Sequence, residues 1–287
     1  MAGMASMAGL GVALMVVAMT LGGQDGSGQA DGTAGEPHLI AVSTKALERS
    51  AEVTALVDAM RSQADALVVL SGGAAKMSEA KQRELFAMLD ALGMLARERR
   101  IVVVDGGTQA GVMEAAGQAR RASGRAFPLI GVAPAREIPP VGQTAVDPNH
   151  SHIIVVDDPS APKGEPSWGS ETATMYWLFD RIARGRPSVA IVANGGPIAF
   201  HEIAANVEAG RPTILIEGSG RAADAVVALL RGTVPADDEV ALMQNQARAA
   251  RLHRRPELFA IVPIGAGAAG LLEAVRTGLG PALPVSK

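Results

Sequence analysis

The chain has no cysteine, few aromatic residues and no excess of positive charge. Its 287 residues include 3% aromatic residues and carry a formal net charge of -3. The absence of cysteine excludes disulfides, thiolate metal sites and a cysteine nucleophile. A slight negative charge gives no electrostatic basis for wrapping nucleic acid, and so few aromatic rings argue against a base-stacking platform for single strands. We therefore expect no nucleic-acid partner.

The N-terminal segment also lacks basic residues, the first one being Lys45. Its apolar run, Ala8–Leu21, is shorter than the roughly 20 residues needed to span a bilayer, and a secretory signal normally begins with basic residues. We expect residues 1–36 to form a disordered or weakly apolar tail of a cytoplasmic protein, with no stable membrane insertion. A cleaved signal or a weak anchor is the alternative. Residues 37–287 are expected to form a single domain.

What the chain does contain is a regular alternation of apolar strands and amphipathic helices from His38 onward. Such alternation implies right-handed βαβ crossovers. We therefore predict an α/β fold with a doubly wound, mostly parallel sheet and helices on both faces. The predicted strands are Leu39–Val42, Ala66–Leu70, Ile101–Asp105, Leu129–Val132, Ile153–Val156, Val189–Val192, Thr213–Ile216 and Phe259–Val262. The predicted helices are Ala46–Met60, Ser78–Glu98, Gly111–Ala122, Glu171–Ala183, Ile198–Glu208, Ala222–Leu230, Glu239–Leu252 and Ala269–Thr277.

One strand-turn-helix segment, residues 101–113, gives the strongest indication of a binding site. Four consecutive β-branched residues from Ile101 predict a strand buried on both faces, and two glycines follow where a side chain would obstruct a ligand or a tight turn. The next helix opens with free N–H groups and a dipole that favour an anion such as phosphate. The segment matches neither GxGxxG nor a Walker A loop, and a plain tight turn is the alternative. Its candidate ligand-binding residues are Gly106, Gly107, Thr108, Gly111, Val112 and Met113.

Small-residue turns follow four further predicted strands. In a parallel sheet the carboxyl ends of the strands lie along one edge, and open α/β sheets bind ligands there. Five such turns on one edge indicate that something bulky and anionic approaches the backbone. The candidate residues they add are Gly72, Gly73, Gly195, Gly196, Gly218, Ser219 and Gly220, and the remaining turn is Gly265–Gly267.

The turn at residues 217–220 leads directly into an arginine, Arg221. Its guanidinium offers a two-pronged donor for phosphate oxygens, and Ser219 could cap the helix or donate to phosphate. Asp224 lies one helical turn beyond Arg221 and could hold it in place. We interpret this turn as ligand-binding. An N-cap with a solvated Arg–Asp pair is the alternative.

A polar segment with two histidines, His150 and His152, follows Asn149. The spacing of the histidines could place both on one face of a strand. The nearest acids lie at the far end of that strand, about 15–20 Å away, so we expect no metal site. A polar loop that hydrogen-bonds a ligand or the backbone is favoured over a purely structural turn. Long Pro- and Gly-rich loops, residues 132–152 and 157–169, accompany this segment, and loops of that length are commonly functional lids or mobile.

Three ordered motifs together resemble one family. They are Asp105-Gly106-Gly107-Thr108-x-x-Gly111-Val112-Met113, Asn149-His150-Ser151-His152 with Trp168-Gly169-x-Glu171, and Glu217-Gly218-Ser219-Gly220-Arg221-Ala222-Ala223-Asp224. The family is the LSDAT branch of the SLOG superfamily, which is related to the cytosolic N-terminal domain of melastatin-type TRP channels. The resemblance extends over Leu39–Thr277, and a prokaryotic stand-alone form is the best match.

This resemblance implies a Rossmann-like domain that binds a nucleotide-derived ligand, foremost ADP-ribose or an NAD derivative, and requires no cofactor. The chain would then act as a ligand sensor without robust catalysis, and a homo-oligomer or a signalling partner stays open. Carried over by motif, the residues that would approach phosphates or ribose are Gly106, Gly107, Thr108, Gly111 and Met113. The second half of the pocket would be Gly218, Ser219, Gly220 and Arg221, with Asn149 and His150 nearby.

A second activity is suggested by the Lonely Guy phosphoribohydrolases of the same superfamily, which carry Pro-Gly-Gly-x-Gly-Thr-x-x-Glu. In this chain Gly195, Gly196 and Glu202 match that pattern, whereas Asn194, Ile198 and Ala199 replace its Pro, last Gly and Thr. Losing the small Gly and the hydroxyl weakens the phosphate cradle. Hydrolysis of a nucleotide N-glycosidic bond, with Glu202 as the catalytic residue, is therefore our second hypothesis.

Overall fold

Eight parallel strands form the centre of the protein in a computed structural model that describes residues 35–73, 75–233 and 254–281. The predicted tail falls almost entirely outside the described residues, as does the predicted helix at residues 239–252. The strands are β1 (His38–Ser43), β2 (Ala66–Gly72), β3 (Ile101–Asp105), β4 (Leu129–Pro134), β5 (His152–Asp157), β6 (Ser188–Ala193), β7 (Thr213–Glu217) and β8 (Phe259–Pro263).

The strand order is β1-β5-β4-β3-β2-β6-β7-β8, and every pair is parallel. From β2 the chain adds β3, β4 and β5 in one direction, and then crosses to the other side of β2 to add β6, β7 and β8. The direction of winding therefore reverses between β2 and β6. The predicted α/β, doubly wound fold is confirmed, and this reversal marks the place where such sheets bind ligands.

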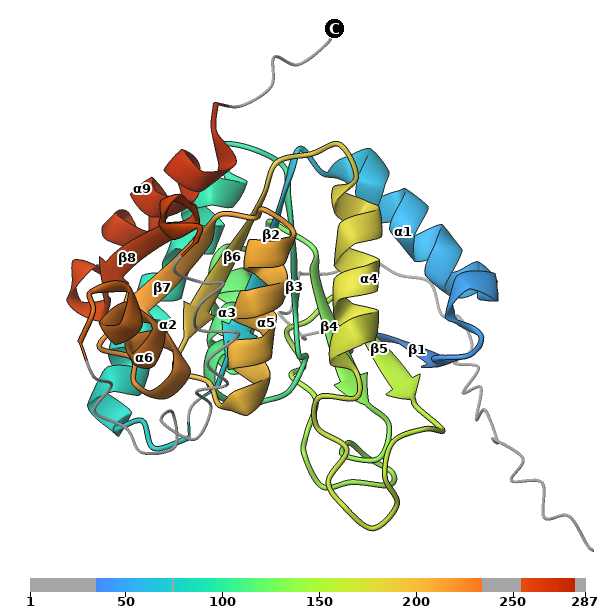
Figure 1. Cartoon of the computed structure of the whole chain (residues 1–287). Coiled ribbons are helices and arrows are strands. Elements are labelled where there is room, and N and C mark those ends of the chain that lie inside the picture. Colours follow the sequence, from blue (N-terminus) through green and yellow to red (C-terminus); the bar gives the residue numbers. More distant parts are fainter. Residues whose placement is uncertain (1–34, 74, 234–253, 282–287) are drawn as a thin grey trace, which may run out of the picture. The chain divides into compact units, whose positions relative to one another are not determined.

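Helices cover both faces of the sheet (Figure 1). Alternate residues of β2 point to opposite faces of the sheet. Leu67 and Val69 pack with the helices of one face, and Val68 and Leu70 pack with those of the other. One face carries α1 (Ala51–Gln63), α4 (Thr172–Ala183), α5 (Pro197–Glu208) and α6 (Arg221–Leu230), and the other carries α2 (Glu79–Ala96), α3 (Gly111–Ala122) and α9 (Gly267–Leu279).

The first helix differs from its prediction. It was expected from Ala46 but begins at Ala51, because Leu47–Arg49 forms a 3₁₀ turn and Ser50 caps the helix. The Ser50 hydroxyl accepts a hydrogen bond from the Val53 N–H over 3.3 Å, which satisfies a donor that has no partner within the helix. Every other predicted strand and helix within the described residues begins and ends within two residues of its expected bounds. None of the described helices is long and apolar enough to cross a membrane.

Candidate functional site

A cavity of about 480 Å³ lies at the carboxyl edge of the sheet, where the paired strands β2 and β6 end. The ends of these two strands, the turn after β3 and the first turns of α4, α5 and α6 all reach it. The predicted site residues that line this cavity are Gly72, Gly73, Gly106, Thr108, Met113, Gly195, Gly196, Glu202 and Arg221. The structure thus brings together residues from three of the five small-residue turns, and Arg221, which directly follows a fourth.

Eight other predicted site residues do not line this cavity. They are Gly107, Gly111, Val112, Asn149, His150, Gly218, Ser219 and Gly220. Val112 is fully buried in the core between α3 and the sheet. The hydroxyl of Ser219 donates to the Ile216 carbonyl and accepts from the Asn194 N–H over 2.7 Å. It therefore joins the turn after β7 to the turn after β6 and does not line the cavity.

The glycines at the junction of β2 and β6 are needed by the fold itself. Gly72 has a φ of +139°, and a Cβ atom there would lie 1.9 Å from the carbonyl oxygen of Ala193. Gly195 has a φ of +88°, and its Cβ would lie 2.3 Å from that of Ala199. Backbone therefore approaches backbone at the floor of the cavity, in conformations that L side chains rarely adopt.

A buried carboxyl group lies inside the cavity on α5. Glu202 is 7% exposed, and the Ser71 hydroxyl at the end of β2 donates a hydrogen bond to its Oε2. Burial raises the pKa of Glu202 to about 7, the neighbouring Glu171 carboxylate adds to this rise, and the Ser71 hydrogen bond opposes it. Glu202 can therefore both take up and release a proton near neutral pH.

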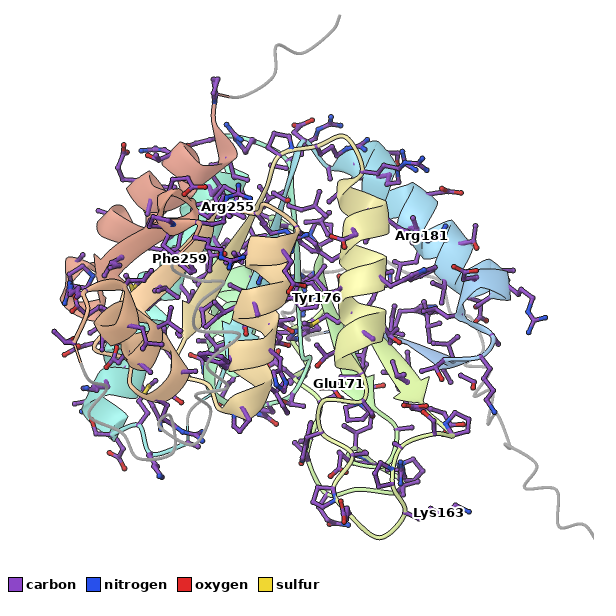
Figure 2. All side chains as sticks on the ribbon, in the orientation of Figure 1. Lys163, Glu171, Tyr176, Arg181, Arg255 and Phe259 are labelled. Atoms are coloured by element: carbon purple, nitrogen blue, oxygen red, sulfur yellow. The ribbon has the colours of Figure 1, made fainter. Side chains whose placement is uncertain are left out.

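A second buried carboxyl group, Glu171, lies beside the first residue of α4 and lines the same cavity. Its Oε2 accepts a hydrogen bond from the Gly169 N–H over 2.8 Å, and burial raises its pKa. Figure 2 shows Glu171 at the end of α4 that meets the loops, with Tyr176 further along the helix. The Tyr176 hydroxyl contacts the Glu202 carbonyl oxygen at 3.4 Å, so α4 and α5 are tied together beside both carboxyl groups.

Arg221 supplies positive charge to the cavity from the first position of α6. A Cβ atom on Gly196 would lie 3.1 Å from Arg221 Nη2, so the guanidinium lies against the backbone at the start of α5. Arg221 has a φ of +47°, a conformation that is uncommon for a residue with a side chain. Asp224 accepts hydrogen bonds from the Gly218 and Gly220 N–H groups over 2.7 and 3.0 Å, which shapes the turn that presents Arg221.

His150 is buried between two carboxylates and away from the cavity. Its Nε2 lies 2.8 Å from Asp105 Oδ1, and its Nδ1 lies 3.1 Å from Asp147 Oδ1. Burial disfavours the charged imidazole, but the two carboxylates outweigh this effect and raise the pKa of His150 to about 9. Asp105 Oδ1 also accepts the Gly107 N–H over 2.7 Å. The histidine segment therefore fastens the loop before β5 onto the turn after β3.

The remaining residues of this segment contact the protein. The Asn149 carbonyl accepts a hydrogen bond from Arg120 over 2.6 Å, and Asn149 borders a separate surface cavity beside α3. The ring of His152 meets that of His38 edge to face, with centroids 5.8 Å apart. Among the described residues, no group of three or more His, Asp or Glu side chains is placed to hold a metal ion.

The two long loops form one wall of the cavity. Glu137 Oε1, from the loop after β4, accepts hydrogen bonds from the Ser167 N–H and hydroxyl over 2.5 and 2.8 Å. Through this contact the loop after β5 is held against the loop after β4. Thr144 from one loop and Trp168 from the other line the cavity. Trp168 is 39% exposed, so part of its ring is accessible from the solvent side.

Fold and cavity define a doubly wound α/β protein with a ligand-sized site where the winding of its sheet reverses. Over residues 65–262 the sequence matches the family model described as SLOG in TRPM, prokaryote. The chain belongs to this family, as its motifs predicted. Family membership supports nucleotide-related binding or processing.

Individual relatives cover less of the chain. The sequence is 32% identical over 114 residues to transient receptor potential cation channel subfamily M member 2 of Mus musculus, and 32% identical over 113 residues to that of Rattus norvegicus. Each match covers 36% of this chain and only 7% of the channel. Among solved structures, the X-ray structure of the structural genomics target TM1055 matches 74% of this chain and 96% of its own, with 23% identity and a TM-score of 0.46.

Proposed function

We propose that this protein binds a nucleotide-derived ligand that carries phosphate, with ADP-ribose or an NAD derivative as the ligand class. The observation that carries the proposal is the position of Arg221 against Gly196, at the start of α5 and inside the cavity. A guanidinium beside a helix N-terminus favours an anion twice, through the charge of the side chain and through the N–H groups and dipole of the helix.

The rest of the cavity suits the other parts of such a ligand. Met113, Met175 and Trp168 give an apolar surface for a base, and Glu171 and Glu202 offer carboxyl oxygens for polar or charged groups of the nucleoside. A volume of about 480 Å³ lies within the range of about 300–1,000 Å³ that is typical of small-molecule sites. In this proposal no cofactor is required.

Calorimetry of the purified chain with ADP-ribose, NAD⁺ and AMP tests the proposal. Replacing Arg221 by Gln removes the charged hydrogen bonds to phosphate, and we expect binding to weaken by about 1.5–3 kcal/mol. Arg97→Gln is the matched control, because Arg97 is exposed at the end of α2, on the opposite edge of the sheet. No binding of any of these nucleotides at millimolar concentration would overturn the proposal.

Glu202 favours a second candidate function, hydrolysis of a nucleotide N-glycosidic bond. A buried carboxyl group with a pKa of about 7 that accepts a hydrogen bond from Ser71 is suited to general acid–base catalysis near neutral pH. In this reaction water adds at the anomeric carbon of the ribose, the C–N bond breaks, and the base leaves with a proton.

Chromatography of a nucleotide panel after incubation with the protein tests the hydrolase hypothesis. A free base should accumulate with the wild-type protein and disappear with Glu202→Gln. Glu208→Gln, an equal loss of charge at the exposed end of the same helix, should leave the release unchanged. If every nucleotide is recovered intact, the hydrolase hypothesis is wrong and binding alone remains.

A further inference from the structure

The cavity has a positive group and a pair of carboxyl groups at separate positions. Arg221 lies against Gly196 at the start of α5, whereas Glu202 is six residues further along the helix, which is about 9 Å along its axis. Glu171, at the N-cap of α4, lines the same cavity as Glu202, and its charge contributes to the raised pKa of Glu202. A ligand that fills this space therefore meets positive charge in one part and two acids in another.

The two acids are buried in the lining of the same cavity. Glu171 and Glu202 are 8% and 7% exposed, and their hydrogen bonds come from the neutral Gly169 N–H and Ser71 hydroxyl. Within the described part of the chain, no lysine, arginine or histidine is among the causes that shift the pKa of either group. Burial disfavours the ionised form of both groups, the charge of Glu171 adds to this at Glu202, and the charge of Glu137 adds to it at Glu171. A bound cation would relieve these costs.

We infer that Glu171 and Glu202 select a ligand whose heterocyclic base is positively charged where it joins the ribose, as the oxidised nicotinamide ring of NAD⁺ is. This inference rests on the proposed nucleotide site, and it names the charge that the site prefers. A phosphate at Arg221 and a cationic ring between the two acids match the charge distribution of the cavity. ADP-ribose and the reduced dinucleotide NADH offer the phosphate but no cation.

The comparison of NAD⁺ with NADH isolates this charge, because the two dinucleotides share the same phosphates and riboses. We measure both affinities by calorimetry with the full chain at about pH 8, and expect NAD⁺ to bind at least about tenfold more tightly. Carba-NAD⁺, in which a carbocycle replaces the nicotinamide ribose, keeps the cation but has no N-glycosidic bond between the nicotinamide and a ribose. It should bind like NAD⁺, which separates binding from turnover.

Two variants assign the preference to the carboxyl pair. Glu202→Gln keeps an oxygen that can accept the Ser71 hydrogen bond, and Glu171→Gln does the same for the Gly169 N–H. We expect each variant to lower the ratio of NAD⁺ affinity to NADH affinity several-fold. Glu208→Gln removes the same charge from the exposed end of α5, and its ratio should equal that of the wild type. Thermal melting identifies a variant that fails to fold. In that case the affinity ratio of the other carboxyl variant tests the inference.

The outcomes distinguish failure of the charge selection from failure of the proposed nucleotide site. Equal affinity of the wild type for NAD⁺ and NADH overturns the charge selection, while the proposed nucleotide site stands. A variant that weakens both dinucleotides equally shows that the acids only shape the cavity, which also overturns the selection. If none of the dinucleotides nor ADP-ribose binds, the proposed function itself fails.

Discussion

The buried carboxyl group of Glu202 couples protein stability to pH. Its pKa of about 7 in the folded chain lies above its ordinary value of 4.5. The protonated group therefore contributes stability that is fully present below pH 4.5 and is lost as the pH rises through 7. The difference of about 2.5 pKa values corresponds to about 3 kcal/mol. We expect Glu202→Gln, which cannot ionise, to gain about this much stability relative to the wild type between pH 4.5 and about pH 8.5.

Urea unfolding of both proteins at the two pH values measures this gain. The subtraction removes the contribution of His150, whose pKa of about 9 makes both proteins less stable as the pH rises beyond its ordinary value of 6.5. An unchanged difference between variant and wild type at the two pH values would show that Glu202 is solvated and ionises normally.

At the scale of single residues, the sequence predicted which chemical groups form the site better than it predicted where each side chain lies. Glu202 and Arg221 were predicted from motifs, and both line the cavity. His150 was expected near the ligand because a polar loop residue can hydrogen-bond a ligand or the protein with equal ease. The structure gives it two protein carboxylates as partners. The part played by Ser71 was not predicted, because its contact with Glu202 spans 131 positions of the chain and follows only from the pairing of β2 with β6.

At the scale of elements, the turn after β2 depends on one glycine and not on the next. Gly72 has a φ of +139°, and an added Cβ would lie 1.9 Å from a backbone oxygen of β6, whereas a Cβ on Gly73 would meet nothing within 4 Å. Gly72→Ala should therefore destabilise the fold by at least about 3 kcal/mol, since backbone must shift in addition to adopting a strained φ. Gly73→Ala should change stability by less than about 0.5 kcal/mol.

Unfolding in urea compares these two adjacent substitutions directly. They remove the same residue type from neighbouring positions, so any general effect of replacing glycine by alanine is common to both. Similar midpoints for the two variants would mean that β2 and β6 are not packed as closely as the structure describes.

Most elements could be predicted because each strand and helix carries its own pattern. The β-branched run of β3 and the start of α3 at Gly111 were placed at their observed bounds. The start of α1 was wrong because the apolar pattern continues through Leu47, which is buried in a 3₁₀ turn, and because the capping role of Ser50 was not recognised. Local patterns thus predict the type of an element more reliably than its ends.

At the scale of the whole molecule, strand order was the main feature that the sequence did not supply. Alternation of strands and helices predicts a parallel sheet, but it does not say on which side of β2 the chain resumes after β5. That choice places the turn of β6 beside the turn of β2 and so creates the cavity. The clustering of three turns and Arg221 around one space, with Gly265–Gly267 outside it, depends on this topology.

The same topology predicts that ligand binding stabilises the entire fold. The cavity is lined from both halves of the sheet, by Gly106 after β3 and by Gly195 after β6, so a bound nucleotide links the two directions of winding. A ligand that binds only the folded chain raises the free energy of unfolding by about 2.7 kcal/mol when its concentration is 100 times its dissociation constant. For a domain of this size we expect the melting temperature to rise by roughly 5–10 °C.

Melting curves with increasing NAD⁺ or ADP-ribose test this expectation in the wild type and in Arg221→Gln. At a concentration that raises the wild-type midpoint by several degrees, the variant should show a much smaller rise, because its dissociation constant is larger by the factor that calorimetry measures. Arg97→Gln should follow the wild type. Equal rises in all three proteins would place the nucleotide away from Arg221, since a ligand that does not contact the guanidinium gains nothing from it in the folded state.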